Sequence, residues 1–296
     1  MKKVLITGAN SYIGQSVEKW LMKEHESYQI STLDLRGEGW KRVDFTGYDC
    51  VFHVAGIAHA DTGHVNNEQK KMYYDINTEL AVEVAEKAKK SGVRQFILMS
   101  TMIIYGDYFN IKEKRIITKV SKPCPINFYG NSKWQADNRI YKMKSDNFNV
   151  VILRPPAVYG KGCKGNYIYL SKIAGLVPIF PYVDNQRSML YIDNLCEFVK
   201  LMIDNEEEGI FFPQNKEYVN TSVMVKLISE AQGRKMRLTK ALNPLIWFIN
   251  FLPGKLSNLS KKAFSNAIYD MTISDYEKGE YRLKSLRESI IETECK

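Results

Sequence analysis

The feature that most constrains the fold is a regular alternation between short apolar segments and amphipathic helical segments. The apolar segments are rich in β-branched and aromatic residues and have the length of buried strands. They cover residues 3–7, 28–33, 50–55, 94–100 and 149–154, and the helical patterns between them cover 13–23, 74–90 and 129–144. Strands that alternate with helices form parallel sheets with right-handed crossovers, so the helices lie on both faces. We therefore predict an α/β fold with a doubly wound parallel sheet.

The first predicted strand leads directly into a glycine-containing turn, TGANSYIG at residues 7–14. Gly8 permits a tight turn and Gly14 allows the next helix to pack close to the sheet, so that backbone N–H groups point toward a pyrophosphate. Ser11 stands where the usual pattern has its middle glycine, and a plain strand-to-helix turn is the alternative. The turn predicts a dinucleotide-binding site of the Rossmann type.

Asp34 follows the second predicted strand, about twenty residues after the turn. A carboxylate at this place accepts hydrogen bonds from the adenosine ribose, which favours NAD over its 2'-phosphorylated form. Arg36 lies two residues further on and weakens that preference, so NADP is the alternative cofactor. An aspartate that ends a strand is otherwise a turn or cap residue.

The alternation becomes less regular after about residue 160, where glycine-rich and aromatic segments and shorter helical patterns follow. A chain of 296 residues exceeds the usual size of one domain, which suggests either one large domain or a main domain with a smaller second part. We expect a dinucleotide-binding domain over residues 1–160 and a smaller C-terminal part, 161–296, that mostly binds substrate. A segment near 187–215 is expected to return to the main domain.

Tyr129 and Lys133 lie four residues apart at the start of a predicted helix, in the sequence FYGNSKWQAD. On a helix this spacing places both side chains on one face. A tyrosine phenol has a reference pKa of about 10, and a neighbouring ammonium lowers that pKa toward the range of proton exchange at neutral pH. The pair predicts a catalytic acid and base, and a solvated helix face is the ordinary alternative.

The motifs, taken in order, resemble those of the extended short-chain dehydrogenase/reductases, and within them the NAD-dependent sugar-nucleotide epimerase/dehydratase family typified by UDP-glucose 4-epimerase. The resemblance covers most of the chain and rests on many elements in the family order. These elements are TGANSYIG, LDL around Asp34, VDF around Asp44, HVAG at 53–56, Asn77, STMIIYG at 100–106, YGNSK at 129–133, LRPPAVYG at 153–160 and RSMLYIDN at 187–194.

The resemblance implies a role for each matched position. Tyr129 would be the catalytic acid and base, Lys133 would hold the nicotinamide ribose, and Thr101 would hydrogen-bond the reacting oxygen. The implied cofactor-binding residues are Gly8, Asn10, Ser11, Tyr12, Ile13, Gly14, Asp34, Asp44, Phe45, Val54, Ala55, Gly56, Asn77, Tyr129, Lys133 and Pro156. The implied substrate-binding residues are Thr101, Tyr129, Asn166 and Arg187.

Arg187 resembles the arginine that binds the diphosphate of a nucleotide sugar in this family. A guanidinium suits that task because its planar fork binds phosphate oxygens bidentately, and a surface salt bridge is the alternative. Lys164 and Asn166, in the loop KGCKGNY, are further candidates for substrate contact.

Three positions depart from the family pattern. Met102 and Ile103 replace the Asp-Glu pair of the 4,6-dehydratases, and an apolar pair cannot protonate a leaving hydroxyl, which argues against dehydratase chemistry. Ala58 stands where 4-epimerases often carry a basic residue, which argues against very tight retention of the cofactor.

His53 is interpreted as structural, and no metal site is expected because His25, His59 and His64 lack metal-ligand spacing.

Charge and cysteine usage limit the partners and the location. The 42 Lys+Arg and 33 Asp+Glu residues leave a formal charge of +9, but the basic residues are spread along the chain without a nucleic-acid-binding motif. We therefore expect a phosphate-bearing small molecule and no nucleic acid. An odd number of scattered cysteines and the absence of an export signal or membrane span predict a cytoplasmic protein with reduced thiols. The cysteines are Cys50, Cys124, Cys163, Cys196 and Cys295.

The segment 234–262 combines basic residues with the apolar sequence LIWFINFL at 245–252, which is too short to cross a bilayer. The ordinary interpretation is a helix that packs against the substrate-binding part or against a second subunit in a homodimer. The alternative is a helix that lies peripherally on an anionic membrane.

The leading functional hypothesis is an NAD(P)-dependent oxidoreductase that acts at C4 of a nucleotide-activated hexose, in glycan precursor synthesis. It has two forms, a 4-epimerase, favoured by Asp34, and a 4-keto-sugar reductase, favoured by Ala58. One alternative is a reductase of a non-nucleotide ketone, such as a steroid or polyphenol, which Arg187 would distinguish. Another is a cofactor-binding regulatory or scaffold protein without turnover, against which Thr101, Tyr129 and Lys133 argue.

Overall fold

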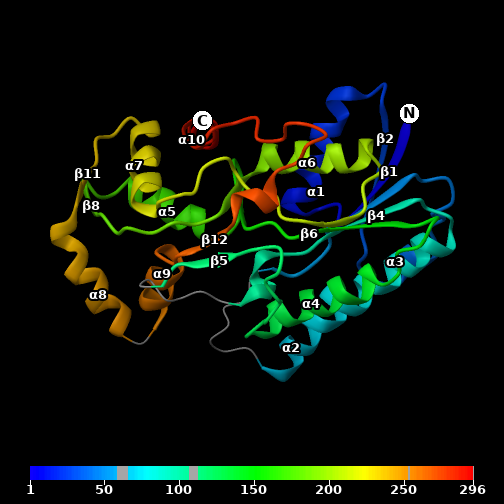
Figure 1. Cartoon of the computed structure of the whole chain (residues 1–296), viewed down its shortest axis with the longest axis horizontal. Coiled ribbons are helices and arrows are strands. Elements are labelled where there is room, and N and C mark those ends of the chain that lie inside the picture. Colours follow the sequence, from blue (N-terminus) through cyan, green and yellow to red (C-terminus); the bar gives the residue numbers. More distant parts are fainter. Residues whose placement is uncertain (59–65, 107–112, 253, 296) are drawn as a thin grey trace.

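The centre of the protein is a six-stranded parallel sheet, as seen in a computed structural model that describes residues 1–58, 66–106, 113–252 and 254–295. The strands lie in the order β10-β6-β4-β3-β1-β2, and every neighbouring pair is parallel (Figure 1). They are β1 (Lys2–Thr7), β2 (Tyr28–Leu33), β3 (Cys50–His53), β4 (Gln95–Met99), β6 (Asn149–Leu153) and β10 (Gly209–Phe211). The predicted doubly wound sheet is confirmed, and β10 is a sixth strand that the sequence pattern did not predict.

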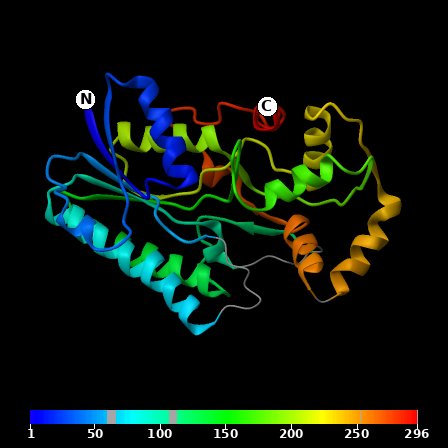
Figure 2. The same cartoon turned by 180° about the vertical axis from the view of Figure 1, so that it is seen from behind.

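Helices cover both faces of this sheet (Figures 1 and 2). One face carries α1 (Tyr12–Leu21) and α6 (Ile192–Asp204), and the other carries α3 (Ala81–Lys90) and α4 (Phe128–Tyr141). Alternate strand residues supply the two cores, because successive side chains point to opposite faces. Val4 and Ile6 of β1 belong to the α1/α6 core, whereas Leu5 belongs to the α3/α4 core.

The helix predicted over 74–90 begins earlier than predicted and is interrupted by a wider turn. The helical segment consists of α2 (Asn67–Tyr74), most of which precedes the predicted range, a π-helical segment Asp75–Leu80, and α3. π-Helical segments are rare and are frequently found at functional sites. This one directs Asn77 and Thr78 toward α4, where the Thr78 hydroxyl donates to the Ser132 carbonyl at 2.7 Å.

Outside the main sheet, the described residues form three two-stranded parallel sheets and five further helices. The strand pairs join distant segments, so that β5 lies beside β12, β7 beside β9 and β8 beside β11. Their bounds are β5 (Arg115–Ile117), β7 (Ala157–Tyr159), β8 (Ile179–Pro181), β9 (Met189–Tyr191), β11 (Arg237–Thr239) and β12 (Ala267–Tyr269), and the helices are α5 (Asn166–Ala174), α7 (Thr221–Ala231), α8 (Asn243–Phe251), α9 (Lys255–Ala263) and α10 (Leu286–Glu294). The domain boundary at residue 160 stays a prediction.

Helix α8 differs from the other long helices because none of its residues is buried. It packs on α9, and only Ile246 contacts the large core (Figure 1). No helix in the described residues has the length and apolarity needed to cross a membrane. All five cysteines are free thiols.

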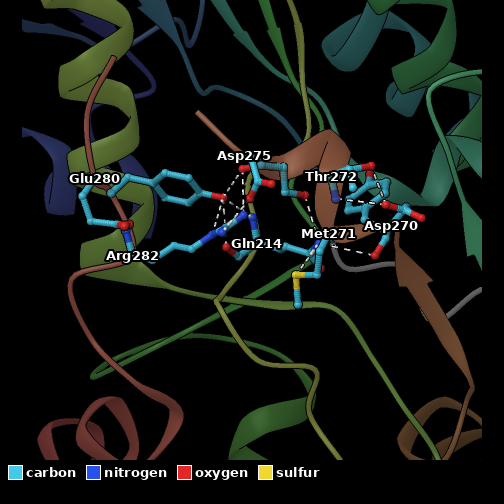
Figure 3. A network of polar contacts seen from close by, with 10 residues as sticks. Gln214, Asp270, Met271, Thr272, Asp275, Glu280 and Arg282 are labelled. Carbon is cyan, nitrogen blue, oxygen red and sulfur yellow. Dashed lines mark hydrogen bonds and ion pairs between the residues drawn. The ribbon is translucent and has the colours of Figure 1, made fainter. Parts of the chain in front are cut away.

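A buried polar network fastens the C-terminal segment to the end of the main sheet (Figure 3). Gln214 lies at its centre, where its side chain accepts from the Ser188 hydroxyl at 2.5 Å and donates to the Ser274 hydroxyl at 3.0 Å. The Tyr281 hydroxyl donates to the Ser274 carbonyl at 2.9 Å, and the Arg282 guanidinium donates to the same carbonyl at 2.8 Å. These contacts satisfy groups that would otherwise be buried without partners.

A buried ion pair fastens α4 to the sheet. Arg154, directly after β6, donates from Nε and Nη2 to the two carboxylate oxygens of Asp137 on α4, each at 2.9 Å. The two side chains are only 6% and 1% exposed. Ser100 donates to the same carboxylate at 3.0 Å, and Arg154 donates from Nη1 to the Tyr105 hydroxyl at 2.6 Å. Bidentate geometry and additional hydrogen bonds are what a buried pair needs to offset its desolvation.

Replacing one partner of this pair should be costly. We expect Asp137→Asn to lower the free energy of unfolding by about 3–5 kcal/mol, because it leaves a buried guanidinium without its counter-charge. The matched control is Glu79→Gln, which breaks the exposed Arg139–Glu79 pair near the same helix and should cost less than about 1 kcal/mol. Urea unfolding measures both, and equal effects would contradict the structural role given to Asp137.

Candidate active site

The glycine turn lies at the point where the strand order reverses. The chain passes from β1 to β2 on one side and then to β3 on the other, and ligands of doubly wound sheets bind outside the strand ends at such a point. Gly8 has φ +98°, and a Cβ there would lie 2.7 Å from the Ala55 nitrogen, so the turn and the end of β3 touch with no room for a side chain. Ser11 caps α1, its hydroxyl accepting from the Gly14 nitrogen at 3.0 Å.

The first turn of α1 offers an anion-binding surface. The N–H groups at the start of a helix have no acceptor within the helix and carry the positive end of its dipole. Here they come from Tyr12, Ile13 and their neighbours, beside Asn10 and opposite Val54 and Ala55. The missing side chain at Gly8 and the free donors fit the diphosphate of a dinucleotide.

Tyr12 extends from this turn toward the loop after β7. Its hydroxyl is buried and has no hydrogen-bond partner in the part of the chain that is described, and burial raises its pKa. A Cβ at Gly160 would lie 2.7 Å from that hydroxyl and 2.4 Å from Ile192 Cγ2. Gly160 is therefore required where α1, α6 and the β7 loop meet.

The residues expected near the adenosine lie after β2. Asp34 is exposed and accepts from the Arg36 backbone nitrogen at 3.0 Å and from its guanidinium at 2.8 Å, and this hydrogen bonding lowers the Asp34 pKa. Asp44 accepts from the Thr46 nitrogen at 2.9 Å, which lowers the Asp44 pKa. Phe45 is fully buried in the core, so only its backbone can face a ligand.

A second group of residues converges where β3 and the π-helical segment meet. The buried Asn77 side chain accepts from the Ile57 nitrogen at 2.9 Å and donates to the Ile57 carbonyl and to Ser132 Oγ, both at 3.1 Å. A Cβ at Gly56 would lie 2.9 Å from Asn77 Oδ1 and 3.0 Å from Lys133 Nζ. The structure thus brings Gly56, Asn77 and Lys133 into one cluster.

Lys133 is buried on the inner face of α4. Its ammonium donates to the Met99 carbonyl, at the end of β4, at 3.0 Å. Burial lowers the Lys133 pKa to about 8, although the Asp137 carboxylate opposes this change. A lysine with this pKa can exchange protons close to neutral pH.

Tyr129 lies one helical turn before Lys133, with its ring edge-on to Tyr73 at 6.3 Å between centroids. Burial raises the Tyr129 pKa to about 12, and a hydrogen bond with the Thr101 hydroxyl opposes the rise. This differs from the expectation that the Lys133 ammonium lowers the Tyr129 pKa, because desolvation of the phenolate dominates in the chain alone. Thr101 also caps the turn Met102–Tyr105 through the Ile103 nitrogen at 3.3 Å.

The substrate candidates are less closely grouped. Arg187 is partly buried and donates to the Ala263 carbonyl at 3.3 Å, and within the described residues it has no carboxylate partner. Burial lowers its pKa to about 10. Pro156 is buried in the loop after β6, next to a Pro155 carbonyl that accepts from the Met102 nitrogen at 2.9 Å. Asn166 is exposed at the start of α5 and has no hydrogen bond to other candidates in the described part of the chain.

His53 ends β3, beside Thr7 at the end of β1. His53 is buried, hydrogen-bonded through Nδ1 to the Thr7 hydroxyl at 2.8 Å, and burial lowers its pKa to about 3. His59 and His64 lie outside the described residues. Among the residues that the structure describes, no group of three or more His, Cys, Asp or Glu side chains is placed to hold a metal.

Sequence reasoning missed two supporting residues. Ser132 bridges Asn77 and the Tyr129 carbonyl, to which its hydroxyl donates at 2.9 Å. Asp137 combines the ion pair with Arg154 and an electrostatic effect on Lys133. The available signal was helical spacing, since Asp137 follows Lys133 by four residues and Tyr129 by eight, on the same face.

The Lys133 pKa should be visible in protein stability. Between pH 8 and pH 10.5, Lys133 is protonated in the unfolded chain and deprotonated in the folded chain, so the free energy of unfolding should rise with pH in this window. Below pH 8 the folded lysine is charged, and the full cost of burying that charge lowers the stability. Relative to Lys133→Met, the unfolding free energy of the wild type should increase by up to about 3 kcal/mol across the window. Urea titrations at several pH values measure this difference, and parallel pH curves for the two proteins would contradict it.

Comparison with known proteins identifies relatives for this arrangement. Residues 4–212 match the model of the NAD dependent epimerase/dehydratase family. The UDP-glucose 4-epimerase of Vibrio cholerae is 25% identical over 258 residues, which cover 78% of this chain and 76% of that protein. The N-acetyl-alpha-D-glucosaminyl-diphospho-ditrans,octacis-undecaprenol 4-epimerase of Escherichia coli O157:H7 is 25% identical over 281 residues, which cover 88% and 82%.

Solved structures with the same fold include enzymes of two activities. The UDP-glucuronic acid 4-epimerase of Bacillus cereus, in complex with NAD, superposes with a TM-score of 0.70 at 16% identity and covers 99% of this chain and 97% of its own. The dTDP-4-dehydrorhamnose reductase of Bacillus anthracis, in complex with NADP, has a TM-score of 0.69 at 18% identity and covers 99% and 98%. At these identities the likeness shows the fold alone.

Proposed function

This chain belongs to the NAD dependent epimerase/dehydratase family, whose model matches residues 4–212, and from that premise we propose that it is an NAD(P)-dependent enzyme acting at C4 of a nucleotide-activated hexose. The observation that carries the proposal is the grouping of Thr101, Tyr129 and Lys133 at the carboxyl end of β4. The turn at Gly8 supplies the matching diphosphate-binding surface.

Each residue of the group has a distinct task in the proposed reaction. Bound nicotinamide dinucleotide supplies hydride chemistry at the sugar carbon. Tyr129 removes the proton from the C4 hydroxyl and returns one to the C4 oxygen, and Thr101 orients that oxygen through its own hydroxyl. Lys133, fixed on the Met99 carbonyl, provides an ammonium that stabilises phenolate once a ligand closes the site.

Arg187 supports a substrate that carries a diphosphate. It is a half-buried cation that lacks a carboxylate partner in the described structure, and an anionic ligand would supply the missing charge. Both relatives named above act, by their names, on a sugar joined to a diphosphate. A non-nucleotide ketone would leave this guanidinium without a function.

The apolar side chains of Met102 and Ile103 argue against dehydratase activity. The two residues form a short turn directly after Thr101, and Met102 is buried. Neither side chain can donate a proton to a leaving hydroxyl. The 4-epimerase and the 4-keto reductase both need only the residues present, and Ala58, exposed after β3, favours the reductase because no basic side chain there holds the cofactor.

Removing the Tyr129 hydroxyl tests the chemical assignment. Tyr129→Phe keeps the ring and its contact with Tyr73, so dinucleotide affinity should be unchanged. Turnover should fall by about 100- to 10,000-fold, the usual contribution of general acid–base catalysis. Calorimetry and steady-state kinetics measure the two quantities, and turnover near the wild-type level would exclude Tyr129 from the mechanism.

A product assay distinguishes the two activities and tests Arg187. The protein is incubated with UDP-hexoses, UDP-N-acetylhexosamines or 4-keto sugar nucleotides, with and without NAD(P)H. An epimerase should interconvert C4 isomers without net change in NAD(P)H absorbance, whereas a reductase should consume NAD(P)H only with a 4-keto sugar.

In the same assay Arg187→Ala should raise KM for the sugar nucleotide about tenfold or more, with dinucleotide affinity retained, because it removes a charge-assisted contact to the diphosphate. The control is Arg94→Ala, an exposed arginine away from the candidate residues, which should behave as wild type. If no nucleotide sugar reacts and Arg187→Ala has no effect, the substrate assignment is wrong.

A further inference from the structure

Helix α8 presents an unusual amount of apolar side chain to solvent. Seven of its nine residues, NPLIWFINF, are apolar, yet none is buried. Phe251 is 85% exposed, Phe248 63%, Leu245 54% and Trp247 39%. Exposed apolar residues are normal when they are single, but a continuous patch of this kind marks an interaction site.

The same segment carries most of the net charge of the chain. Residues 234–262 contain seven Lys or Arg residues and no Asp or Glu, so they contribute +7 to a total of +9. Arg234, Lys235, Arg237 and Lys240 are exposed. Apart from Lys255, whose side chain is not described, these basic residues form no ion pair within the described structure.

We propose that the α8–α9 hairpin docks this protein onto the surface of an anionic lipid bilayer. The aromatic and aliphatic side chains of α8 would enter the interface between headgroups and acyl chains, and the flanking basic residues would bind the anionic headgroups. Each signal alone gives only weak and reversible attachment, and the combination of a short apolar helix with a basic cluster provides both.

The charge distribution favours a membrane over the other occupants of an apolar face. A two-fold dimer through α8 would place one +7 segment against its copy, because such interfaces pair the same surface with itself. A nucleic acid would bind the basic residues but would leave Leu245, Phe248 and Phe251 in water. An anionic bilayer satisfies the charges and the apolar side chains together.

The hairpin lies at the edge of the molecule and still reaches the candidate substrate site. In both views α8 lies at the periphery, at the end of the molecule opposite the N-terminus (Figures 1 and 2). Helix α9 ends at Ala263, whose carbonyl accepts from Arg187 at 3.3 Å and from the Thr221 hydroxyl at 2.5 Å. A docked hairpin would therefore hold the Arg187 region close to the lipid surface.

Sedimentation with vesicles tests this proposal on the full-length protein. Vesicles of equal parts phosphatidylglycerol and phosphatidylcholine should bind it, vesicles of phosphatidylcholine alone should bind far less, and high salt should weaken the binding. Phe248→Ser with Phe251→Ser, and separately Lys240→Gln with Arg237→Gln, should each raise the lipid concentration for half-maximal binding by more than about tenfold. Leu176→Ser, at an apolar residue 78% exposed elsewhere, and Lys90→Gln are the matched controls and should bind as wild type.

A second measurement keeps the test independent of folding. Trp247 lies in α8, so its fluorescence should shift to the blue on anionic vesicles, and the shift should vanish in Trp247→Phe. Unchanged circular dichroism and dinucleotide affinity show that each variant is folded. The proposal would be overturned if the protein bound neutral and anionic vesicles equally, or if it bound neither. It would also be overturned if light scattering showed a dimer that the double variant Phe248→Ser with Phe251→Ser converts to a monomer. An oligonucleotide that releases the protein from anionic vesicles at a concentration below that of the lipid would overturn the proposal as well.

Discussion

Asp137 and Arg154 carry opposite charges in a place where neither is hydrated, and the position of the candidate site depends on their contact. The pair joins α4 to the end of β6, and Ser100 and Tyr105 complete its hydrogen bonds from the end of β4. Because Tyr129 and Lys133 lie on α4 and Thr101 follows Ser100, the pair fixes both halves of the group at once. Such a contact offers geometric definition more than net stability, since the desolvation of both charges offsets much of the attraction.

The electrostatic setting of the site follows from the same helix. Burial disfavours a charge on either Tyr129 or Lys133, so their pKa values move apart, to about 12 and about 8. The Asp137 carboxylate, one turn beyond Lys133, moderates this effect on the lysine while it neutralises Arg154. A single acidic residue thus serves both the anchoring of the helix and the charge state of the ammonium.

The sequence was sufficient to predict the parallel core and to propose the candidate residues. Periodicity located β1, β2, β3, β4 and β6 because buried strands between helices leave an unmistakable apolar pattern. It missed β10, whose three residues, Gly209–Phe211, are too few to show any period. Periodicity also missed the π-helical turn at Asp75–Leu80, because one extra residue in a helix changes the periodic spacing of its apolar residues very little.

Properties that depend on distant contacts could not be predicted. The rise of the Tyr129 pKa comes from desolvation, which the spacing of residues in the sequence does not reveal. The spacing revealed only that the Lys133 ammonium lies on the same helix face as Tyr129. The exposure of α8 was equally hidden, since an apolar segment of this length is compatible with burial and with an interface. The roles of the site residues remain predictions until the variants are measured.

The place of α6 in the fold has a consequence for biosynthesis. The sheet face formed by Val4, Ile6 and their neighbours is covered by α1, which follows β1 directly, and by α6, which begins only at Ile192, so the ribosome makes the buried strands long before it makes the second part of their cover. At the usual rate of about 5–20 residues per second, the part of this face that lies under α6 stays open for about 10–40 seconds in every nascent chain. During that interval the chain presents an apolar sheet surface to the cell, and chaperones that bind such surfaces would meet it before the last strand of the main sheet, β10, has formed.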